Sequence, residues 1–277
     1  MERNHHIKVF LLIVACLFSS VLYAQEEEAP EEKKRDVIRS YRENIGITYD
    51  KSWAFTFKYR TDGWQIGADY NKTINYFKSS VIQFDIGELK HFKQTRQSKD
   101  PSGGIFGFNG IRPFVYGKQN NFYVAHANYG RRHLLAERAR KNGVMIQFQY
   151  TGGISLGILK GYYLDIIPVQ DDGSPDFDSP PVETGYEEGS GNGFTNFNRI
   201  IGYSGFGKGF GDLGIQPGLN ANISFQFDWS SQDSFIKALE GGFHADVYFW
   251  NVPIMVSNNR FYFMSVYVGL LLGKKKN

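Results

Sequence analysis

Residues 215–228 constrain the fold more than any other stretch, because apolar and polar side chains alternate along them. The apolar positions are Ile215, Leu219, Ala221, Ile223, Phe225 and Phe227. Successive side chains of a β-strand point to opposite faces, so this period of two predicts a strand with one apolar and one polar face. At about 3.3 Å per residue the stretch extends about 45 Å, enough to cross a hydrocarbon core of about 30 Å even when tilted. Such a strand suits either a membrane β-barrel or one wall of a soluble sandwich.

Residues 1–24 have the pattern of a secretory signal peptide. Arg3 and Lys8 precede an apolar run from Val9 to Leu22, and Ala24 stands before a polar segment. This pattern predicts export with cleavage after Ala24. Cys16 is the only cysteine, and the residues before it also fit a bacterial lipoprotein signal, so lipidation is an alternative. After cleavage at Ala24 the chain would have no disulfide, thiol nucleophile or cysteine-ligated metal.

Charge and composition exclude two classes of protein. Removal of Arg3, Lys8 and Glu2 with the signal changes Lys+Arg from 31 to 29 and Asp+Glu from 28 to 27, so the formal charge falls from +3 to +2. This near balance gives no electrostatic case for nucleic acid as a partner. No segment after residue 24 holds about 20 consecutive apolar residues, which excludes a helical membrane protein. An exported chain can still cross a membrane as a closed barrel, whose alternating strands look polar on average.

The rest of the chain divides into a charged flexible leader at residues 25–43 and an all-β region at residues 44–277. Alternating runs predict strands near residues 45–49, 53–59, 64–70, 82–86, 122–129, 144–167, 197–203, 215–228, 243–250 and 262–272, with a bend at 152–153 and a further short strand near 114–116. Asp62-Gly63 and residues 257–259 predict hairpin turns. Residues 170–193 predict an acidic loop, which a ten-strand count would place on the periplasmic side.

The lengths of these runs favour a barrel over a soluble sandwich, whose strands usually have about five or six residues. Aromatic side chains also gather toward strand ends, as an interfacial girdle requires. These pairs are Tyr59 and Trp64, Tyr70 and Tyr76, and Tyr248 and Trp250. The sequence therefore predicts an all-β fold: an antiparallel transmembrane β-barrel of about 8–10 strands.

Several segments resemble a family of small, largely uncharacterised outer-membrane β-barrel proteins of Bacteroidota-type bacteria. These segments are the signal ending Leu22-Tyr-Ala-Gln25, Asp62-Gly-Trp-Gln-Ile-Gly67, residues 114–123, residues 152–164 and the closing strand ending at Gly273. The resemblance covers most of residues 45–273, and it implies location and architecture rather than activity. One departure is the end of the chain, where Lys274 to Asn277 stand in place of the terminal aromatic residue of many such barrels.

Two motifs are candidate ligand sites. Gly209-Phe-Gly-Asp-Leu-Gly214 has the spacing of a dinucleotide fingerprint, but that chemistry needs a following helix, and a predicted strand follows instead. The acidic loop has carboxylates enough for calcium but lacks the ligand spacing of an EF-hand. We therefore expect a glycine turn and a solvated loop, with no cofactor and no metal site.

A lipid-modifying hydrolase would need a nucleophile, a histidine base and a carboxylate. Ser224, His126, His244 and Asp246 are such groups on polar strand faces, but no local motif joins them. They read more simply as lumen-facing polar residues, so no catalytic site is predicted. The expected inward-facing polar core comprises Gln65, Asp69, Gln83, Asp85, Gln147, Gln149, Gln216, Asn220, Asn222 and Gln226.

The sequence thus predicts a protein of the cell outer membrane with a structural or interaction role and no wide pore. The expected partners are outer-membrane lipids and lipopolysaccharide, and other envelope proteins. A lipid-modifying enzyme, a barrel component of a secretion or assembly machine, and a secreted soluble β-sandwich are the alternatives.

Overall fold

The computed structural model describes residues 51–99, 112–137, 143–170, 173–188, 193–230 and 235–276. The predicted signal peptide (1–24), the predicted leader (25–43) and the strand expected at 45–49 lie outside these residues. Regular structure in the described ranges consists of strands. None of their segments forms a helix with the length and apolar character needed to cross a bilayer.

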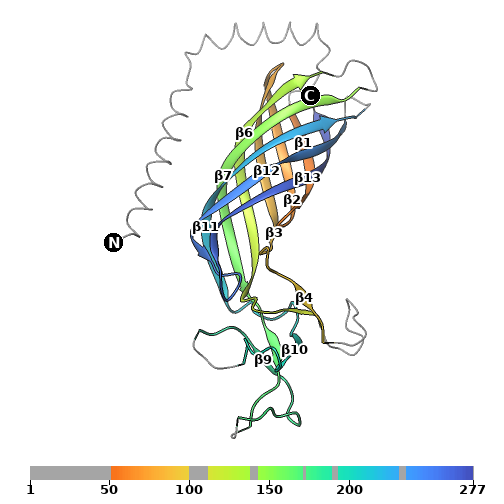
Figure 1. The fold of residues 1–277 in the computed structure, drawn as a ribbon. Coiled ribbons are helices and arrows are strands. Elements are labelled where there is room, and N and C mark those ends of the chain that lie inside the picture. The colour runs from red at the N-terminus through yellow and green to blue at the C-terminus, as the bar shows by residue number, and fades with distance from the viewer. Residues whose placement is uncertain are drawn as a thin grey trace, which may run out of the picture. The chain divides into compact units, whose positions relative to one another are not determined.

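Eight long strands close into one barrel (Figure 1). They are β1 (Lys51–Arg60), β2 (Gly63–Asn75), β3 (Lys78–Leu89), β6 (Asn120–Ala136), β7 (Met145–Gly161), β11 (Leu213–Asp228), β12 (Phe235–Val252) and β13 (Arg260–Lys276). Their order around the barrel is β1-β13-β12-β11-β7-β6-β3-β2, and every neighbouring pair is antiparallel. The pairing of β1 with β13, from Lys51 with Lys276 to Arg60 with Tyr267, closes the sheet. The prediction of an antiparallel all-β barrel is confirmed, and a two-sheet sandwich is excluded.

The connections differ at the two ends of the barrel. At the terminal end, defined as the end where β1 begins and β13 stops, β2 and β3 are joined by two residues. At the opposite end, called the loop end here, lie the two-residue turn 61–62 and the connections 90–119, 162–212 and 253–259. Connections 90–119 and 162–212 carry the short strands β4 (Arg96–Gln97), β5 (Phe114–Val115), β8 (Leu164–Ile166), β9 (Val182–Thr184) and β10 (Ile200–Tyr203).

Three strand expectations are corrected by this arrangement. Residues 114–115 and 200–203 form strands outside the barrel, because they pair with β4 and β8 and not with a barrel strand. The strand expected to run to residue 167 ends at Gly161, and β8 then leaves the barrel. With eight barrel strands, the acidic loop lies at the loop end, opposite to the terminal end.

The two faces of the sheet have opposite chemistry. In β1 the residues Ser52, Thr56, Lys58 and Arg60 are buried, whereas the aromatic side chains between them are exposed. The same inversion recurs around the barrel: polar side chains such as Gln83 fill the interior, while the alternate apolar positions face outward. The period of two in the sequence thus produces a polar core and an apolar outer wall.

Apolar clusters close the interior near both ends. At the loop end the cluster contains Leu89, Phe122, Val124, Leu159, Tyr248, Val252, Ile254, Met255 and Phe263. At the terminal end a smaller cluster contains Ala54, Ile236, Ala238 and Leu271. Tyr248 was expected in the outer girdle, but it is 2% exposed and points inward, since β12 places it on the same face as His244 and Asp246.

Candidate functional site

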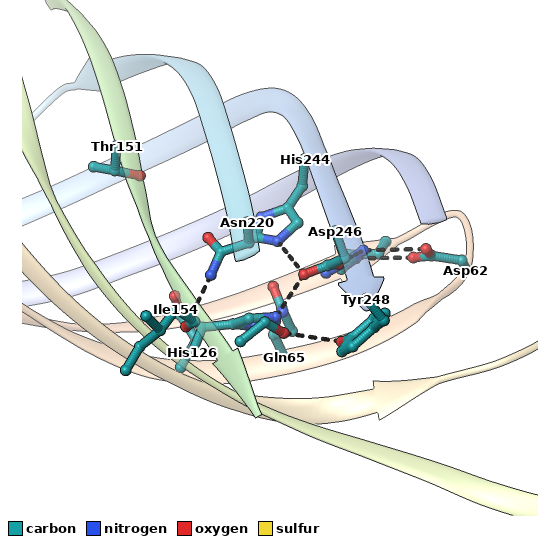
Figure 2. A network of polar contacts seen from close by, with 12 residues as sticks. Asp62, Gln65, His126, Thr151, Ile154, Asn220, His244, Asp246 and Tyr248 are labelled. Atoms are coloured by element: carbon teal, nitrogen blue, oxygen red, sulfur yellow. Dashed lines mark hydrogen bonds and ion pairs between the residues drawn. The ribbon is translucent and has the colours of Figure 1, made fainter. Parts of the chain in front are cut away.

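The centre of the barrel interior holds a cluster of ionisable side chains around Asp246 on β12. The Arg60 guanidinium donates to Asp246 Oδ2 at 3.0 Å, and the Nε2 atoms of His126 and His244 lie 2.8 and 3.3 Å from Asp246 Oδ1. Figure 2 shows both imidazoles directed at this carboxylate. Arg60 also donates to Asp62, through Nε at 2.8 Å. Strands β1, β6 and β12 therefore meet at one carboxylate.

The neighbours of this cluster fix the proton on His126. The Gln65 side-chain amide donates to His126 Nδ1 at 2.9 Å, so Nε2 carries the proton that is donated to Asp246. On the loop-end side, the hydroxyls of Ser155 and Tyr248 lie 2.9 Å apart. The imidazole of His126, held at both nitrogens, serves here as a spacer between strands.

A second group of charged side chains lies nearer the terminal end. Lys58 on β1 forms an ion pair with Asp85 on β3 at 3.2 Å, and both side chains are 1% exposed. Tyr267 donates to Glu240, whose other oxygen accepts from Gln226 at 2.9 Å. Buried charges are tolerated only when they are paired and hydrogen-bonded. The Lys58–Asp85 pair joins β1 and β3, which are not neighbours, whereas the bonds of Glu240 join β12 to its neighbours β11 and β13.

The arrangement does not form the nucleophilic site of a hydrolase. The structure brings His126, His244 and Asp246 together, but the hydrogen bonds of the two imidazoles go to Asp246 and Gln65. Ser224 on β11 pairs in register with Gly242, one inward position away from His244. The serine hydroxyl that is hydrogen-bonded beside the cluster is that of Ser155, and its partner is the Tyr248 hydroxyl rather than an imidazole.

The same three side chains have the composition of a metal-ligand set, with ligand atoms that lie within 4.8 Å of one another. Their environment does not suit a cation. The guanidinium of Arg60 already occupies one carboxylate oxygen, and both imidazoles are directed at the other oxygen as hydrogen-bond donors. A divalent ion would have to displace these donors and would lie beside a buried positive charge.

Most of the expected polar core lies inside the barrel. Gln65, Asp69, Gln83, Asp85, Gln149, Asn220, Asn222 and Gln226 are buried, whereas Gln147 and Gln216 are half-buried. The interior also holds buried polar partners that were not expected there, namely Lys58, Arg60, Arg132, Glu240 and Tyr267. The alternation along each strand does place these residues on its polar face. Long charged side chains, however, were not expected inside a barrel.

The two candidate ligand motifs, the glycine motif 209–214 and the acidic loop 170–193, belong to the segment between β8 and the start of β11. Residues 209–212 lead into β11, so the glycine motif is followed by a strand and not by a helix. In the described part of the acidic loop, Asp176 accepts hydrogen bonds from Ser179 and from the backbone of Asp178, and these bonds lower its pKa. Glu183 forms an exposed ion pair with Lys208 at 2.7 Å.

Lys118 joins the loop-end connections to the barrel. Its amine donates to Gln94 at 3.3 Å and lies 5.3 Å from the centre of the Tyr162 ring, and its backbone forms a bridge with Met255. Burial lowers the pKa of Lys118 from its ordinary value of 10.5 to about 8, and the positive charges of Lys90 and Arg96 act in the same direction. A buried amine thus lies where three connections meet.

Comparison with known proteins finds similar folds at low similarity. No protein-family model and no curated protein sequence matches the chain. Among solved structures, the N-terminal β-barrel domain of Pseudomonas aeruginosa OprF has a TM-score of 0.34 and 8% identity, covering 82% of this chain and 96% of that one. Neisserial surface protein A has a TM-score of 0.35 and 6% identity, with coverage of 82% and 96%.

A third similar structure is Ail, the attachment invasion locus protein of Yersinia pestis, in complex with the heparin analogue sucrose octasulfate. It has a TM-score of 0.34 and 8% identity, covering 81% of this chain and 95% of that one. These scores are low, and the fold of the present chain rests on its own strand order and register.

Proposed function

We propose that this chain is a β-barrel protein of the cell outer membrane with a structural or interaction role and without a wide pore. The observation that carries the proposal is the apolar outer wall. Phe55, Phe84, Ile86, Met264 and Leu272 are each at least 61% exposed, and they stand on outward positions of β1, β3 and β13. A soluble protein rarely exposes a continuous apolar surface of this kind, whereas a lipid bilayer covers it favourably.

The height of the apolar wall supports the same proposal. On β13 the outward positions are Tyr262, Met264, Val266, Val268, Leu270 and Leu272. Ten residue steps at about 3.3 Å give about 33 Å along the strand, or about 25 Å across the bilayer at a tilt of about 40°. This is the height of the apolar band of outer-membrane barrels.

The filled interior supports a role without transport through the lumen. The ion pairs of Lys58 and Arg60 and the apolar clusters at both ends occupy the space inside the eight strands. An eight-stranded barrel is just wide enough for side chains to fill it. His126 is hydrogen-bonded at both ring nitrogens and His244 at Nε2, and none of these partners is a serine hydroxyl, which likewise supports a non-enzymatic role over a lipid-modifying hydrolase.

Lipids and lipopolysaccharide of the outer membrane are the proposed partners of the outer wall, and other envelope proteins are the proposed partners of the loop end. The loop end presents exposed aromatic side chains for such contacts, among them Phe177 at 77% and Phe206 at 63%. The resemblance to outer-membrane barrels of Bacteroidota-type bacteria agrees with this proposal. A place in a secretion or assembly complex would be one form of such an interaction role.

The proposal is tested by fractionation and by gel mobility. Outer-membrane fractions of cells that express the full chain should contain the protein, and its electrophoretic mobility should differ between unboiled and boiled samples. The reason is that a closed barrel resists detergent until it is heated. Recovery of the protein in the soluble periplasmic fraction, with the same mobility in both samples, would refute the proposal.

A further inference from the structure

Three lysines stand side by side on the outer wall at the terminal end of the barrel. Lys51 on β1 is directly opposite Lys72 on β2 and directly opposite Lys276 on β13. All three are exposed, and each occupies an outward position of its strand. Lys274, also outward and exposed, faces Trp53 one outward position nearer the loop end. We call Lys51, Lys72, Lys274 and Lys276 the lysine strip.

Directly opposite like charges destabilise a sheet, because cross-strand side chains lie about 5 Å apart. On the outward positions of β1, β2, β12 and β13 at this end, the described residues include no Asp or Glu to neutralise the strip. Lys237 on β12 adds a further outward positive charge. Within the described part of these four strands, the outward positive charges of the strip are therefore not balanced by a carboxylate.

The neighbours of the strip place it at the boundary between lipid tails and water. Trp53 and Tyr70 are paired with each other next to the strip, and they are 46% and 41% exposed. Phe55, at 61% exposed, begins the apolar wall one outward position further. Tryptophan and tyrosine prefer the headgroup level of a bilayer, and lysine amines there extend toward the phosphate groups.

We propose that the lysine strip binds the phosphate groups of anionic phospholipids in the leaflet at the terminal end of the barrel. The inference rests on the proposed membrane function and goes further by naming a headgroup class and the residues that hold it. Each lysine near an anionic surface raises the binding constant by roughly fivefold, so three neighbouring lysines give a strong preference over neutral lipid.

Native mass spectrometry of the full chain in neutral detergent measures this preference. Phosphatidylglycerol and phosphatidylcholine of the same acyl length are added in separate titrations. Phosphatidylglycerol is expected to bind at least about tenfold more tightly. Equal affinity for the two lipids would overturn the inference.

The triple variant Lys51→Gln/Lys72→Gln/Lys276→Gln tests the place of binding, and it is expected to lose most of the preference. The matched control Lys90→Gln/Lys93→Gln/Arg96→Gln removes three exposed positive charges at the loop end, so it changes the net charge equally. The control is expected to retain the preference. Loss of the preference in the control but not in the triple variant would overturn the assignment.

A single substitution gives a second readout. Lys51→Glu places a carboxylate between Lys72 and Lys276, so the variant should melt at a higher temperature than wild type in neutral detergent. Phosphatidylglycerol should raise the melting temperature of wild type but not that of Lys51→Glu. Equal stabilisation of both proteins by the lipid, or equal stabilisation of wild type by inorganic phosphate alone, would contradict a lipid site at the strip.

The outcomes separate this inference from the proposed function. A heat-modifiable protein in the outer-membrane fraction that shows no preference for phosphatidylglycerol refutes the lysine strip alone. A soluble periplasmic protein refutes both.

Discussion

Among single residues, the buried pair of Arg60 and Asp246 makes the sharpest prediction. Both side chains have zero exposure, and their nearest atoms lie 3.0 Å apart. Asp246→Asn removes the charge that balances Arg60, so we expect it to lower the free energy of unfolding by roughly 3 kcal/mol. Urea titration of the refolded barrel in neutral detergent measures the change.

The control for this prediction is an exposed ion pair. Lys208 and Glu183 are 50% and 46% exposed, so Glu183→Gln should change the free energy of unfolding by less than about 1 kcal/mol. An Asp246→Asn variant as stable as the Glu183→Gln variant would mean that the interior pair contributes little.

Lys118 makes a second prediction at this scale, because burial lowers its pKa to about 8 from 10.5. Because the folded chain holds this proton less tightly than the unfolded chain, the charged amine disfavours folding by at most roughly 3 kcal/mol below pH 8. This penalty disappears as the pH rises from 8 to 10.5. Lys118→Met should therefore be more stable than wild type at pH 7, and the difference should shrink toward pH 10.5.

The check is the difference in free energy of unfolding between the two proteins at each pH. Lys208→Met, at an exposed amine, is the control and should show a flat difference. A flat difference for Lys118→Met would contradict a depressed pKa at that position.

The polar core shows what a sequence reveals about single residues. Alternation alone placed Gln65, His244 and Asp246 on inward faces, because the face of a strand residue depends only on its own strand. It could not reveal that Arg60 reaches Asp246, since those residues are 186 positions apart and belong to strands that are not neighbours. The partners of a buried charge are set by closure of the barrel.

At the scale of strands, the close packing of Gly157 on β7 predicts that a larger residue there destabilises the barrel. A Cβ at this position would lie 2.4 Å from the Phe122 ring, which belongs to the apolar cluster at the loop end. We expect Gly157→Ala to lower the free energy of unfolding by about 1–3 kcal/mol, because the ring must shift in a packed region.

Gly241→Ala on β12 is the matched control, since a Cβ there has no atom within 4 Å among the described residues. Its stability should be close to that of wild type. Urea unfolding of both variants under one set of conditions measures the two changes in the free energy of unfolding. Equal decreases would show that the Phe122 contact is unimportant.

The short elements at the loop end explain where strand prediction went wrong. Residues 114–115 and 200–203 have the aromatic and branched composition of barrel strands, and they do form strands. Their partners are β4 and β8, and two or three residue pairs suffice for such small sheets. Local composition predicts an extended backbone but not its partner, and so the expected count ranged up to ten.

For the whole molecule, the even strand number places both ends of the described barrel at its terminal end, and the two longest connections, 90–119 and 162–212, at the other end. In outer-membrane barrels the short turns face the periplasm and the longer loops face outward. The lysine strip at the terminal end and the exposed aromatic residues at the loop end would then contact different leaflets and compartments.

Cysteine labelling tests this orientation, because the sequence contains one cysteine, Cys16, which lies in the predicted signal. In a Cys16→Ser background, Phe177→Cys places a thiol in the loop-end connection and Phe77→Cys places one in the β2–β3 turn, at sites 77% and 61% exposed. A membrane-impermeant maleimide should label Phe177→Cys in intact cells, and it should label Phe77→Cys only after the outer membrane is opened. The inverse pattern would reverse the orientation. Labelling of both thiols in intact cells would mean that the barrel does not separate two compartments.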